Sequence, residues 1–538
     1  MLQTQVLIAG GGPVGMTLAL ELARYGVKSI LVERNSTTTR HPKMDLTNGR
    51  SMELFRRLGI VENLRDAGVP RENPFDISWI TSLSGHELHR FHYPSSAQTQ
   101  ITIRESNDGS HPREAPLRVS QIDIEPVLKG FIDEHPLITV MFGVSFESIV
   151  EETSEGLIVE IKNQESGIID HVSCQYLAGC DGGGSRVRRS LGIELEGDLA
   201  VASAYMVHFH STDTELLQRW GVTWHYQNGA GTLIAQNDRD SWTLQAWLPP
   251  GEDGSSWVAS EVLESWIGKP FDYTILQANP WSAHFVVAEQ YRKGRALLAG
   301  DSAHQYIPTG GYGMNSGIAD AIGLAWALAA NLQGWGGDAL LDAYAEERKS
   351  TAWRCLEASR RHMGIRVQIS ELYQSRPAIE DDTAEAQQSR AQLAEKIAEL
   401  GNAENESWGI ELGYRYRSPI ISLREGTEDL EMGPLLYQPW VEAGFRMPHI
   451  FLKDGESIHD KMGQQYTLFM IGNADSAEFE SCAAKHSMPL TIVRIDEPHA
   501  NSILGKRFIL VRPDQHIAWA DDREPDNLDA LLLQISGR

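Results

Sequence analysis

The sequence predicts an α/β protein with a Rossmann-like domain at its start, an antiparallel-sheet domain inserted into it, and a smaller α/β domain at its C-terminal end. A strand, a glycine-rich turn, a helix and a second strand open the chain. Period-two alternation then interrupts the pattern, as strands with one buried face require. Strands and helices alternate again after residue 408. The length of 538 residues is compatible with about three domains.

Composition and charge exclude several classes of protein. Lys and Arg number 47 against 73 Asp and Glu, which gives a net charge of −26. A nucleic-acid binder would present a basic face, and an anionic membrane would repel this chain, so neither partner is expected. The start of the chain carries no apolar leader, and its 4 cysteines show no CxxC spacing. We therefore expect a reducing, cytoplasmic location.

The opening segment is a βαβ unit. Val6 to Ala9 is an apolar run suited to a buried parallel strand, and Gly10 to Gly15 forms the turn. Thr17 to Tyr25 has helical spacing, Gly26 ends that helix, and a second strand runs from Ser29 to Glu33. This order is typical of doubly wound nucleotide-binding folds.

The glycines of the turn have separate roles in such a unit. Gly10 allows the tight turn, Gly12 lets a pyrophosphate approach the backbone, and Gly15 permits close packing of helix on strand. The helix N-terminus offers free N–H groups to phosphates. Glu33 can accept both hydroxyls of an adenosine ribose. The alternative is a glycine-rich turn that binds nothing.

The pattern further along sets the expected domain boundaries. Alternating segments from Asn73 to Ile103 and from 200 to 287 indicate an inserted antiparallel sheet, whereas 138–179 reads as a meander. The nucleotide-binding domain is expected at 1–75, 105–188 and 285–375, the inserted domain at 76–104 and 189–284, a linker at 376–408 with one helical run (Ala384 to Leu400), and the C-terminal domain at 409–538.

A second glycine-rich motif lies almost 300 residues after the first. Gly300-Asp-Ser-Ala-His304 follows a buried strand, and Pro308 to Asn315 leads into an apolar helix expected from Gly317. Asp301 at a strand end can bind polyol hydroxyls. A ligand that reaches both motifs fits FAD better than NAD. The alternative is a helix-capping loop.

Together these motifs resemble the single-component, FAD-dependent aromatic hydroxylases, the family of p-hydroxybenzoate hydroxylase and phenol hydroxylase. The resemblance covers residues 1 to about 350. It rests on the two glycine motifs, on Cys180-Asp181-Gly182 with Ser185, Val187 and Arg188, on Arg118 with Gln121, and on Tyr344, Glu347 and Arg348. It implies a Rossmann-like FAD-binding domain, an inserted antiparallel-sheet substrate domain and a C-terminal thioredoxin-like domain.

The resemblance also assigns roles to matching positions. Asp301 would bind the ribitol chain, and the Pro308 carbonyl would face the substrate. The flavin ring would be contacted by the backbone around Gly313, Met314 and Asn315. Asp181 would serve FAD and NAD(P)H, or would instead pair with a nearby arginine in a turn. The residues expected to bind the cofactor are Gly10, Gly12, Pro13, Val14, Gly15, Glu33, Arg34, Lys43, Arg118, Gln121, Asp181, Gly182, Asp301, Pro308, Gly311, Gly313, Met314 and Asn315.

The activity that the resemblance implies is hydroxylation of a phenol or another aromatic compound by dioxygen. NAD(P)H would reduce FAD, and a flavin hydroperoxide would transfer oxygen. Two alternatives stay open: an epoxidase or oxidative tailoring enzyme acting on a polycyclic aromatic, and a non-catalytic flavin-binding interaction protein. The C-terminal domain lacks a CxxC motif, so we expect it to be structural or to form a homodimer.

Asp45 and Pro308 are the candidate catalytic residues. Asp45 lies five residues before Arg50, a spacing that resembles phenol hydroxylase, whose base is an Asp at the same offset. A base at the phenol hydroxyl would favour the reactive phenolate. Alternatively, Asp45 caps the helix that begins near Asn48. His208, His210, His225 and His284 occur in strand patterns, where each is more often structural. No cluster has metal-ligand spacing, so no metal is expected.

Overall fold

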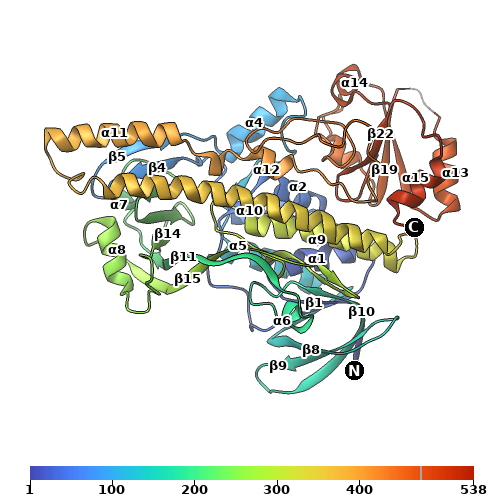
Figure 1. The fold of residues 1–538 in the computed structure, drawn as a ribbon, viewed down its shortest axis with the longest axis horizontal. Helices are drawn as coiled ribbons and strands as arrows, with labels where there is room; N and C mark the ends of the chain where they lie inside the picture. The colour runs from blue at the N-terminus through green and yellow to red at the C-terminus, as the bar shows by residue number, and fades with distance from the viewer. Residues whose placement is uncertain (473–474) are drawn as a thin grey trace.

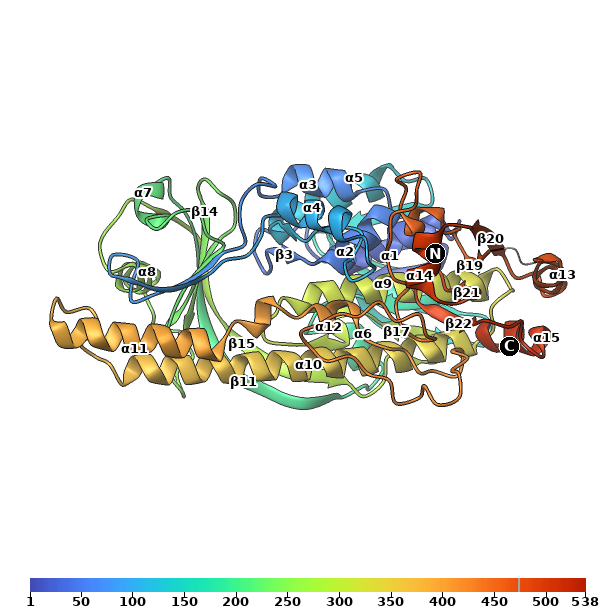
Figure 2. The ribbon, with the colours of Figure 1, turned by 90° about the horizontal axis from the view of Figure 1, so that it is seen from above.

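A computed structural model of the chain describes residues 1–472 and 475–538. The molecule is elongated, with the inserted sheet at one end, the nucleotide-binding domain in the middle and the C-terminal domain at the other end (Figures 1 and 2). The long helix α10 (Ala339–Gln374) runs along the first two parts. The predicted α/β class and the inserted antiparallel sheet are confirmed.

The nucleotide-binding domain is built on a mostly parallel sheet. The strand β1 (Leu2–Ala9) lies between β10 (Ile169–Gly179) and β2 (Ser29–Glu33), and it is parallel to both. Alternate residues of β1 enter different cores: Val6 and Ile8 pack with the helices, and Leu7 packs with the meander. The other strands of this sheet are β7 (Ile138–Phe142), β8 (Val144–Glu152), β9 (Leu157–Asn163), β16 (Arg292–Lys293) and β17 (Ala296–Leu298).

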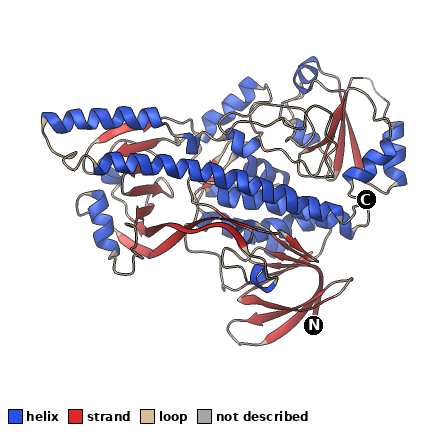
Figure 3. Ribbon diagram, in the orientation of Figure 1, coloured by secondary structure: helices blue, strands red, loops and turns tan. Residues whose placement is uncertain are grey.

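Helices cover one face of this sheet, as the ribbon coloured by secondary structure makes plain (Figure 3). Small residues let them approach closely, and glycines pack where two of them meet. The helices of this domain are α1 (Pro13–Arg24), α2 (Gly49–Arg57), α3 (Val61–Ala67), α5 (Gln121–Glu134), α9 (Tyr312–Leu332) and the short α6 (Arg186–Ser190). Two short strands, β3 (Leu46–Thr47) and β6 (Leu117–Arg118), form a separate pair.

The inserted sheet is joined to this domain by two long strands. The strands β11 (Leu195–His210) and β15 (Thr274–Ala288) are paired along their length and extend from one domain into the other. The order in the sheet is β18-β15-β11-β14-β13-β12-β4-β5, antiparallel except where β12 meets β4. The remaining elements here are β4 (Ile77–Ile80), β5 (Glu87–Phe91), α7 (Thr214–Leu217), β12 (His225–Asn228), β13 (Gly231–Ala235), β14 (Ser241–Trp247), α8 (Ala259–Ile267) and β18 (His304–Gln305).

The C-terminal domain has the strand order β20-β19-β21-β22, with β19 parallel to β20 and antiparallel to β21. Its core continues into that of the nucleotide-binding domain, where the Trp326 ring meets the Tyr466 ring edge-on at 6.1 Å. The elements are α12 (Trp408–Leu412), β19 (Tyr466–Ile471), α13 (Ala477–Lys485), β20 (Leu490–Ile495), α14 (Pro498–Leu504), β21 (Phe508–Val511), β22 (Ile517–Asp521) and α15 (Leu528–Ile535), with short 3₁₀ turns at Ala403–Asn405 and Ile458–Lys461.

The expected strand pattern from Asn73 to Ile103 is wrong in its second half. Residues Ser96–Ser106 form the helix α4, which begins with a capping box between Ser95 and Gln98. Two reciprocal hydrogen bonds at a helix start outweigh weak alternation downstream. The helix packs near Phe451 of the C-terminal domain, so 96–104 does not belong to the inserted sheet.

The segment 376–408, expected to be a linker, is packed. Its helical run is confirmed as α11 (Ala384–Leu400), which buries Leu393 and Ile397 against Ile369 of α10 and Trp79 of β4. A segment that buries apolar side chains is an integral part of the fold. It closes one side of the inserted sheet (Figure 1).

The apolar helix expected from Gly317 begins five residues earlier, at Tyr312. Its N-cap is Gly311, whose φ of +65° suits glycine. Nearly the whole of α9 is buried among the other helices. No helix in the described ranges is long and apolar enough to cross a membrane.

A buried ion cluster joins the C-terminal domain to α10. The Arg512 guanidinium donates to both carboxylate oxygens of Glu347, at 2.7 and 2.8 Å, and to Asp514 at 2.6 Å. All three side chains are at most 5% exposed. The Arg512 charge therefore compensates two buried carboxylates at once.

The variant Arg512→Met should lower the free energy of unfolding by about 3–5 kcal/mol, because two carboxylates would be left buried without a cation. Equilibrium unfolding in urea measures the change. As a control, Arg424→Met removes a half-exposed partner of Glu442 and should change stability by less than about 1 kcal/mol. Equal small losses in both variants would contradict this assignment.

Candidate active site

The first glycine turn is shaped by close contacts. A Cβ on Gly10, whose φ is +113°, would lie 2.1 Å from the Cys180 carbonyl oxygen, and one on Gly15 would lie 2.0 Å from the Gly10 oxygen. Neither position can hold a side chain. A Cβ on Gly12 would meet nothing within 4 Å. Gly12 is the N-cap of α1, so open space faces the free N–H groups of that helix.

Glu33 closes the turn from the end of β2. Its Oε2 accepts a hydrogen bond from the Gly11 N–H at 2.8 Å, and its Oε1 accepts from the Asn35 N–H at 2.9 Å. The carboxylate is thus held beside the glycine turn in a partly exposed position. This placement suits the recognition of ribose hydroxyls.

Val14 brings the two glycine motifs together. A Cβ on Gly300 would lie 2.9 Å from Val14 Cγ2, and one on Gly317 would lie 2.5 Å from the same atom. The start of α1 therefore packs directly against the Gly300 loop and α9. Asp301, next along this loop, is exposed. One extended ligand can reach both motifs.

Asp320 of α9 anchors the second motif. Its Oδ2 accepts from the Gly300 N–H at 2.9 Å and lies 2.8 Å from His304 Nε2, while its Oδ1 accepts from Arg348 Nε at 2.6 Å. Burial raises the pKa of Asp320, but Arg348 and His304 outweigh it and lower the pKa to about 2. The buried carboxylate is therefore ionised and ties the loop to α9 and α10.

Asn315 connects α9 to the segment that carries Asp45. Its Oδ1 accepts from the Asn48 N–H at 3.0 Å, and its Nδ2 donates to the Leu46 carbonyl at 3.0 Å and to that of Gly311 at 2.7 Å. The sequence assigned Asn315 a backbone contact with the flavin. Its side chain sets the position of residues 46–48.

Asp45 is not a helix cap. The N-cap of α2 is Asn48, whose Oδ1 accepts from the Ser51 N–H at 2.9 Å. The Asp45 carboxylate instead accepts a hydrogen bond from Trp224 Nε1 and lies 3.7 Å from His225 Nε2. Burial raises the pKa of Asp45, yet His225, Trp224 and Arg118 together hold it below its usual value. Asp45 is thus a largely buried carboxylate, with its side chain 15% exposed, at the junction of the two sheets.

Arg118 and Gln121 have protein partners. The Arg118 guanidinium donates to the Ala235 carbonyl at 2.9 Å and to that of Pro74 at 3.3 Å, so it joins the two domains. Burial lowers its pKa to about 10 despite the attraction of Asp45. Gln121 Nε2 donates to Glu125 Oε1 at 2.7 Å. Their expected flavin contacts stay predictions.

Asp181 binds the start of the short helix α6, whose N-cap is Ser185. Its carboxylate accepts from the Ser185 hydroxyl and from the backbone N–H groups of Arg186, at 2.7 Å, and Val187, at 3.1 Å. Among the described residues the three nearby arginines have other partners: the Arg186 guanidinium binds Glu147 at 2.6 Å, and those of Arg188 and Arg189 donate to backbone carbonyls. These amide hydrogen bonds hold the carboxylate in place at the end of β10.

The remaining expected site residues lie nearer the surface. The Pro308 carbonyl accepts from the Gly311 N–H at 2.9 Å, so one of its two lone pairs is used in a turn. Its expected contact with a substrate stays a prediction. Pro308, Arg34 and Lys43 are exposed. A Cβ on Gly313 would meet nothing within 4 Å, which leaves open space at the start of α9.

Sequence reasoning missed a buried polar group between α10 and the inserted sheet. Arg366 of α10 pairs with Glu404 at 2.6 Å and donates to the Thr232 hydroxyl at 3.3 Å. His362, one turn earlier, bonds the Tyr312 hydroxyl at 3.0 Å. The partners come from distant segments, so no local spacing could have identified them.

Two family models match the chain. Residues 3–359 match the FAD binding domain, and residues 440–538 match the C-terminal domain of aromatic-ring hydroxylases. The first match alone covers more than half of the chain. The two matches together span the glycine motifs, the segment of Asp45 and most of the C-terminal domain.

Similar proteins support the same assignment. The FAD-dependent monooxygenase apdD of Emericella nidulans is 37% identical over 99% of this chain and 90% of its own length. The structure of RebC soaked with chromopyrrolic acid and holding 7-carboxy-K252c has a TM-score of 0.90 at 30% identity, covering 100% and 99% of the two chains. A complex of aklavinone-11 hydroxylase with FAD and aklavinone has a TM-score of 0.81 at 26% identity, with both chains fully covered.

Glu33→Ala and Asp301→Ala should each weaken FAD binding by roughly ten- to a hundredfold, since a hydrogen bond to a charged group contributes about 1.5–3 kcal/mol. Titration of the apoprotein with FAD, followed by flavin fluorescence, measures the affinity. Glu134→Ala, at the exposed end of α5, is the matched control. Unchanged affinity in both site variants would place the cofactor elsewhere.

Proposed function

The chain belongs to the FAD-dependent aromatic-ring hydroxylases, and we propose that Asp45 and His225 recognise an acidic hydroxyl on its aromatic substrate. The protein is an FAD-dependent monooxygenase that uses NAD(P)H as electron donor. Which residues act on the substrate, and what chemical group they recognise, is our proposal. It rests on the geometry around Asp45.

The residues of the two glycine motifs fit FAD. Gly12 leaves open space before the N-terminus of α1, Glu33 stands beside it, and Val14 brings the exposed Asp301 loop to the same place. Bound FAD supplies the redox chemistry that activates dioxygen. The chain's own residues bind and orient the two reactants, and they control the proton on the substrate.

Asp45 has the properties of a general base. Its carboxylate is ionised although buried, because Trp224 donates to it and Arg118 lies near it. Because its pKa is lowered, the carboxylate is ionised at neutral pH and can accept the proton of a neighbouring hydroxyl. Removing that proton makes the aromatic ring a better nucleophile toward oxygen.

His225 lies beside the Asp45 carboxylate and is the second group proposed to contact the substrate hydroxyl. Its Nε2 is buried, and it has no hydrogen-bond partner in the described ranges. At 3.7 Å, Nε2 is too far from Asp45 for a direct hydrogen bond. A substrate hydroxyl placed between the two groups could donate to the carboxylate and contact the imidazole. Burial, opposed by Asp45, lowers the pKa of His225, so the ring is neutral.

The apolar surroundings suit an aromatic ring. Trp224 packs edge-on against Phe75, with ring centroids 5.7 Å apart, and Ile77 and Ile234 complete the cluster. This combination of an apolar wall with one carboxylate favours a phenol over a substrate without an acidic hydroxyl. The epoxidase alternative requires no such base.

Formation of a homodimer stays a prediction.

Asp45→Asn should lower the rate of product formation by about a hundred- to ten-thousandfold, the usual cost of losing a general base. Consumption of NAD(P)H should continue and yield hydrogen peroxide, because the FAD site is intact. The measurement is the ratio of hydroxylated product to NAD(P)H consumed, in a screen of phenols. Asp133→Asn, on the exposed surface of α5, is the control. A ratio equal to that of the parent would exclude Asp45 as the base.

Trp224→Phe should move the acidic limb of the pH profile of kcat/KM to higher pH. The indole N–H is one of the groups that lower the pKa of Asp45, so its removal raises that pKa. The base then becomes protonated at a higher pH, and activity is lost there first. Trp220→Phe, whose ring packs on Tyr226 instead, should leave the limb in place. A uniform loss of rate with no shift would assign Trp224 a purely structural role.

A further inference from the structure

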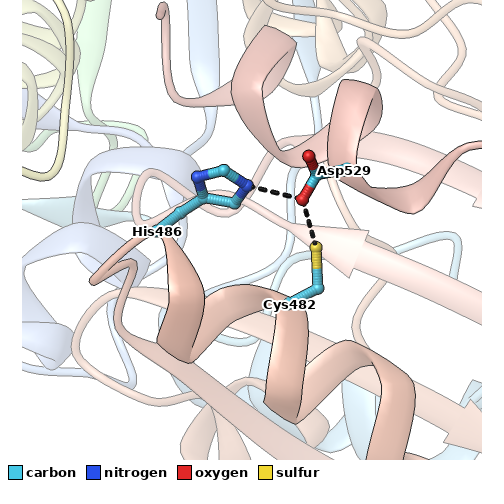
Figure 4. A group of neighbouring side chains, drawn as sticks. All are labelled: Cys482, His486 and Asp529. Atoms are coloured by element: carbon cyan, nitrogen blue, oxygen red, sulfur yellow. Dashed lines mark hydrogen bonds and ion pairs between the residues drawn. The ribbon is translucent and has the colours of Figure 1, made fainter.

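Three side chains that metals commonly use meet in the C-terminal domain. Asp529 Oδ1 lies 3.3 Å from Cys482 Sγ and 2.8 Å from His486 Nε2 (Figure 4). One ligand atom from each residue lies within 4.8 Å of the other two. The sequence predicted no metal site here, because Asp529 lies 43 residues beyond His486.

The local structure presents these ligands together. Cys482 and His486 are four residues apart on α13 and its C-cap, so they share one face of the helix. Two ligands at this spacing on a helix can bind one ion. Asp529 is in the first turn of α15, which packs beside α13. Both helices bury apolar residues, Phe479 and Leu532, in the same core, which holds them in place.

We propose that Cys482, His486 and Asp529 form a zinc-binding site. Zinc binds thiolate, imidazole and carboxylate in tetrahedral geometry, with bonds of about 2.0–2.3 Å that place neighbouring ligand atoms about 3.3–3.5 Å apart. The 3.3 and 2.8 Å separations approach this arrangement, and small side-chain rotations complete it. The mixed sulfur, nitrogen and oxygen ligands favour zinc over magnesium or calcium.

The fourth coordination position of the proposed site can be filled from solvent. All three side chains are partly exposed, so water can complete the coordination. On binding, the Cys482 thiol releases its proton to solvent, and the thiolate, carboxylate and neutral imidazole coordinate the metal. Because the thiol must lose its proton to bind the metal, zinc affinity falls as the pH falls.

Lys485 is the competitor for this site. Its ammonium group lies 2.8 and 2.9 Å from the two oxygens of Asp529. The lysine side chain is 63% exposed and can turn into solvent when zinc binds. Without metal, the Cys482 thiol, the His486 imidazole and the Lys485 ammonium group therefore all contact the carboxylate of Asp529. Zinc would replace these contacts and join α13 to α15.

The test uses the full-length, FAD-loaded protein after removal of metals with a chelator. Alkylation of Cys482 by iodoacetamide is followed by peptide mass spectrometry as ZnCl₂ is added, with the buried Cys174 and Cys355 as internal references. Zinc should protect Cys482, whereas MgCl₂ should not. Asp529→Asn and His486→Gln should raise the half-protecting zinc concentration by at least the roughly 10- to 100-fold that loss of an outer-shell partner costs.

Two further variants separate a metal site from an ion-pair cluster. Asp526→Asn removes an exposed carboxylate outside the group and should leave protection unchanged. Lys485→Met removes the competitor and should lower the half-protecting zinc concentration. FAD content and NAD(P)H oxidation should be the same in all variants, which verifies folding. Absence of zinc protection in both the parent and Lys485→Met, or equal protection in Asp529→Asn and Asp526→Asn, would overturn the proposal.

Discussion

The buried carboxylate of Asp320 is the constraint on which the cofactor side of the molecule depends. It holds the Gly300 N–H, His304 and Arg348 at once, and it is fully buried. A buried charge is tolerated only where it is completely satisfied, so each partner is fixed in turn. The Gly300 loop is thereby fixed against α9. Val14 packs on Gly300 and Gly317, where any side chain would collide with it.

A second set of contacts builds the substrate side. Arg118 of the nucleotide-binding domain binds the Ala235 carbonyl of the inserted sheet, and Trp224 of that sheet binds Asp45. The two domains therefore share one polar junction, and the carboxylate lies at its centre. The side chain of Asn315, at the start of α9, is hydrogen-bonded to the backbone of residues 46 and 48 and so connects this junction to α9. The resemblance places the flavin ring at the same end of α9. The segment that carries Asp45 and the N-terminus of α9 are thus connected through the side chain of Asn315.

The C-terminal domain is part of the same body. Its Tyr466 packs on Trp326 of α9, and its Arg512 neutralises Glu347 of α10. Glu347 is adjacent to Arg348, the partner of Asp320. The ion clusters of the cofactor loop and of the C-terminal domain therefore meet on one turn of α10. The C-terminal domain is thus held to α9 and α10 through one apolar contact and one buried ion cluster.

The sequence by itself determined the fold class, the two glycine motifs and their cofactor, and the candidacy of Asp45. These are local signals: a turn that requires glycine, a strand that alternates and a helix that begins at a cap are encoded within about ten residues. It misplaced α4, because the capping box there outweighed a weak alternation, and it misplaced the start of α9, which lies within a glycine-rich stretch. Only the tertiary structure decided that Asp45 meets Trp224, 179 residues away, and that Asp320 holds Gly300. Contacts of this kind arise from the packing of whole elements, and no spacing along the chain encodes them.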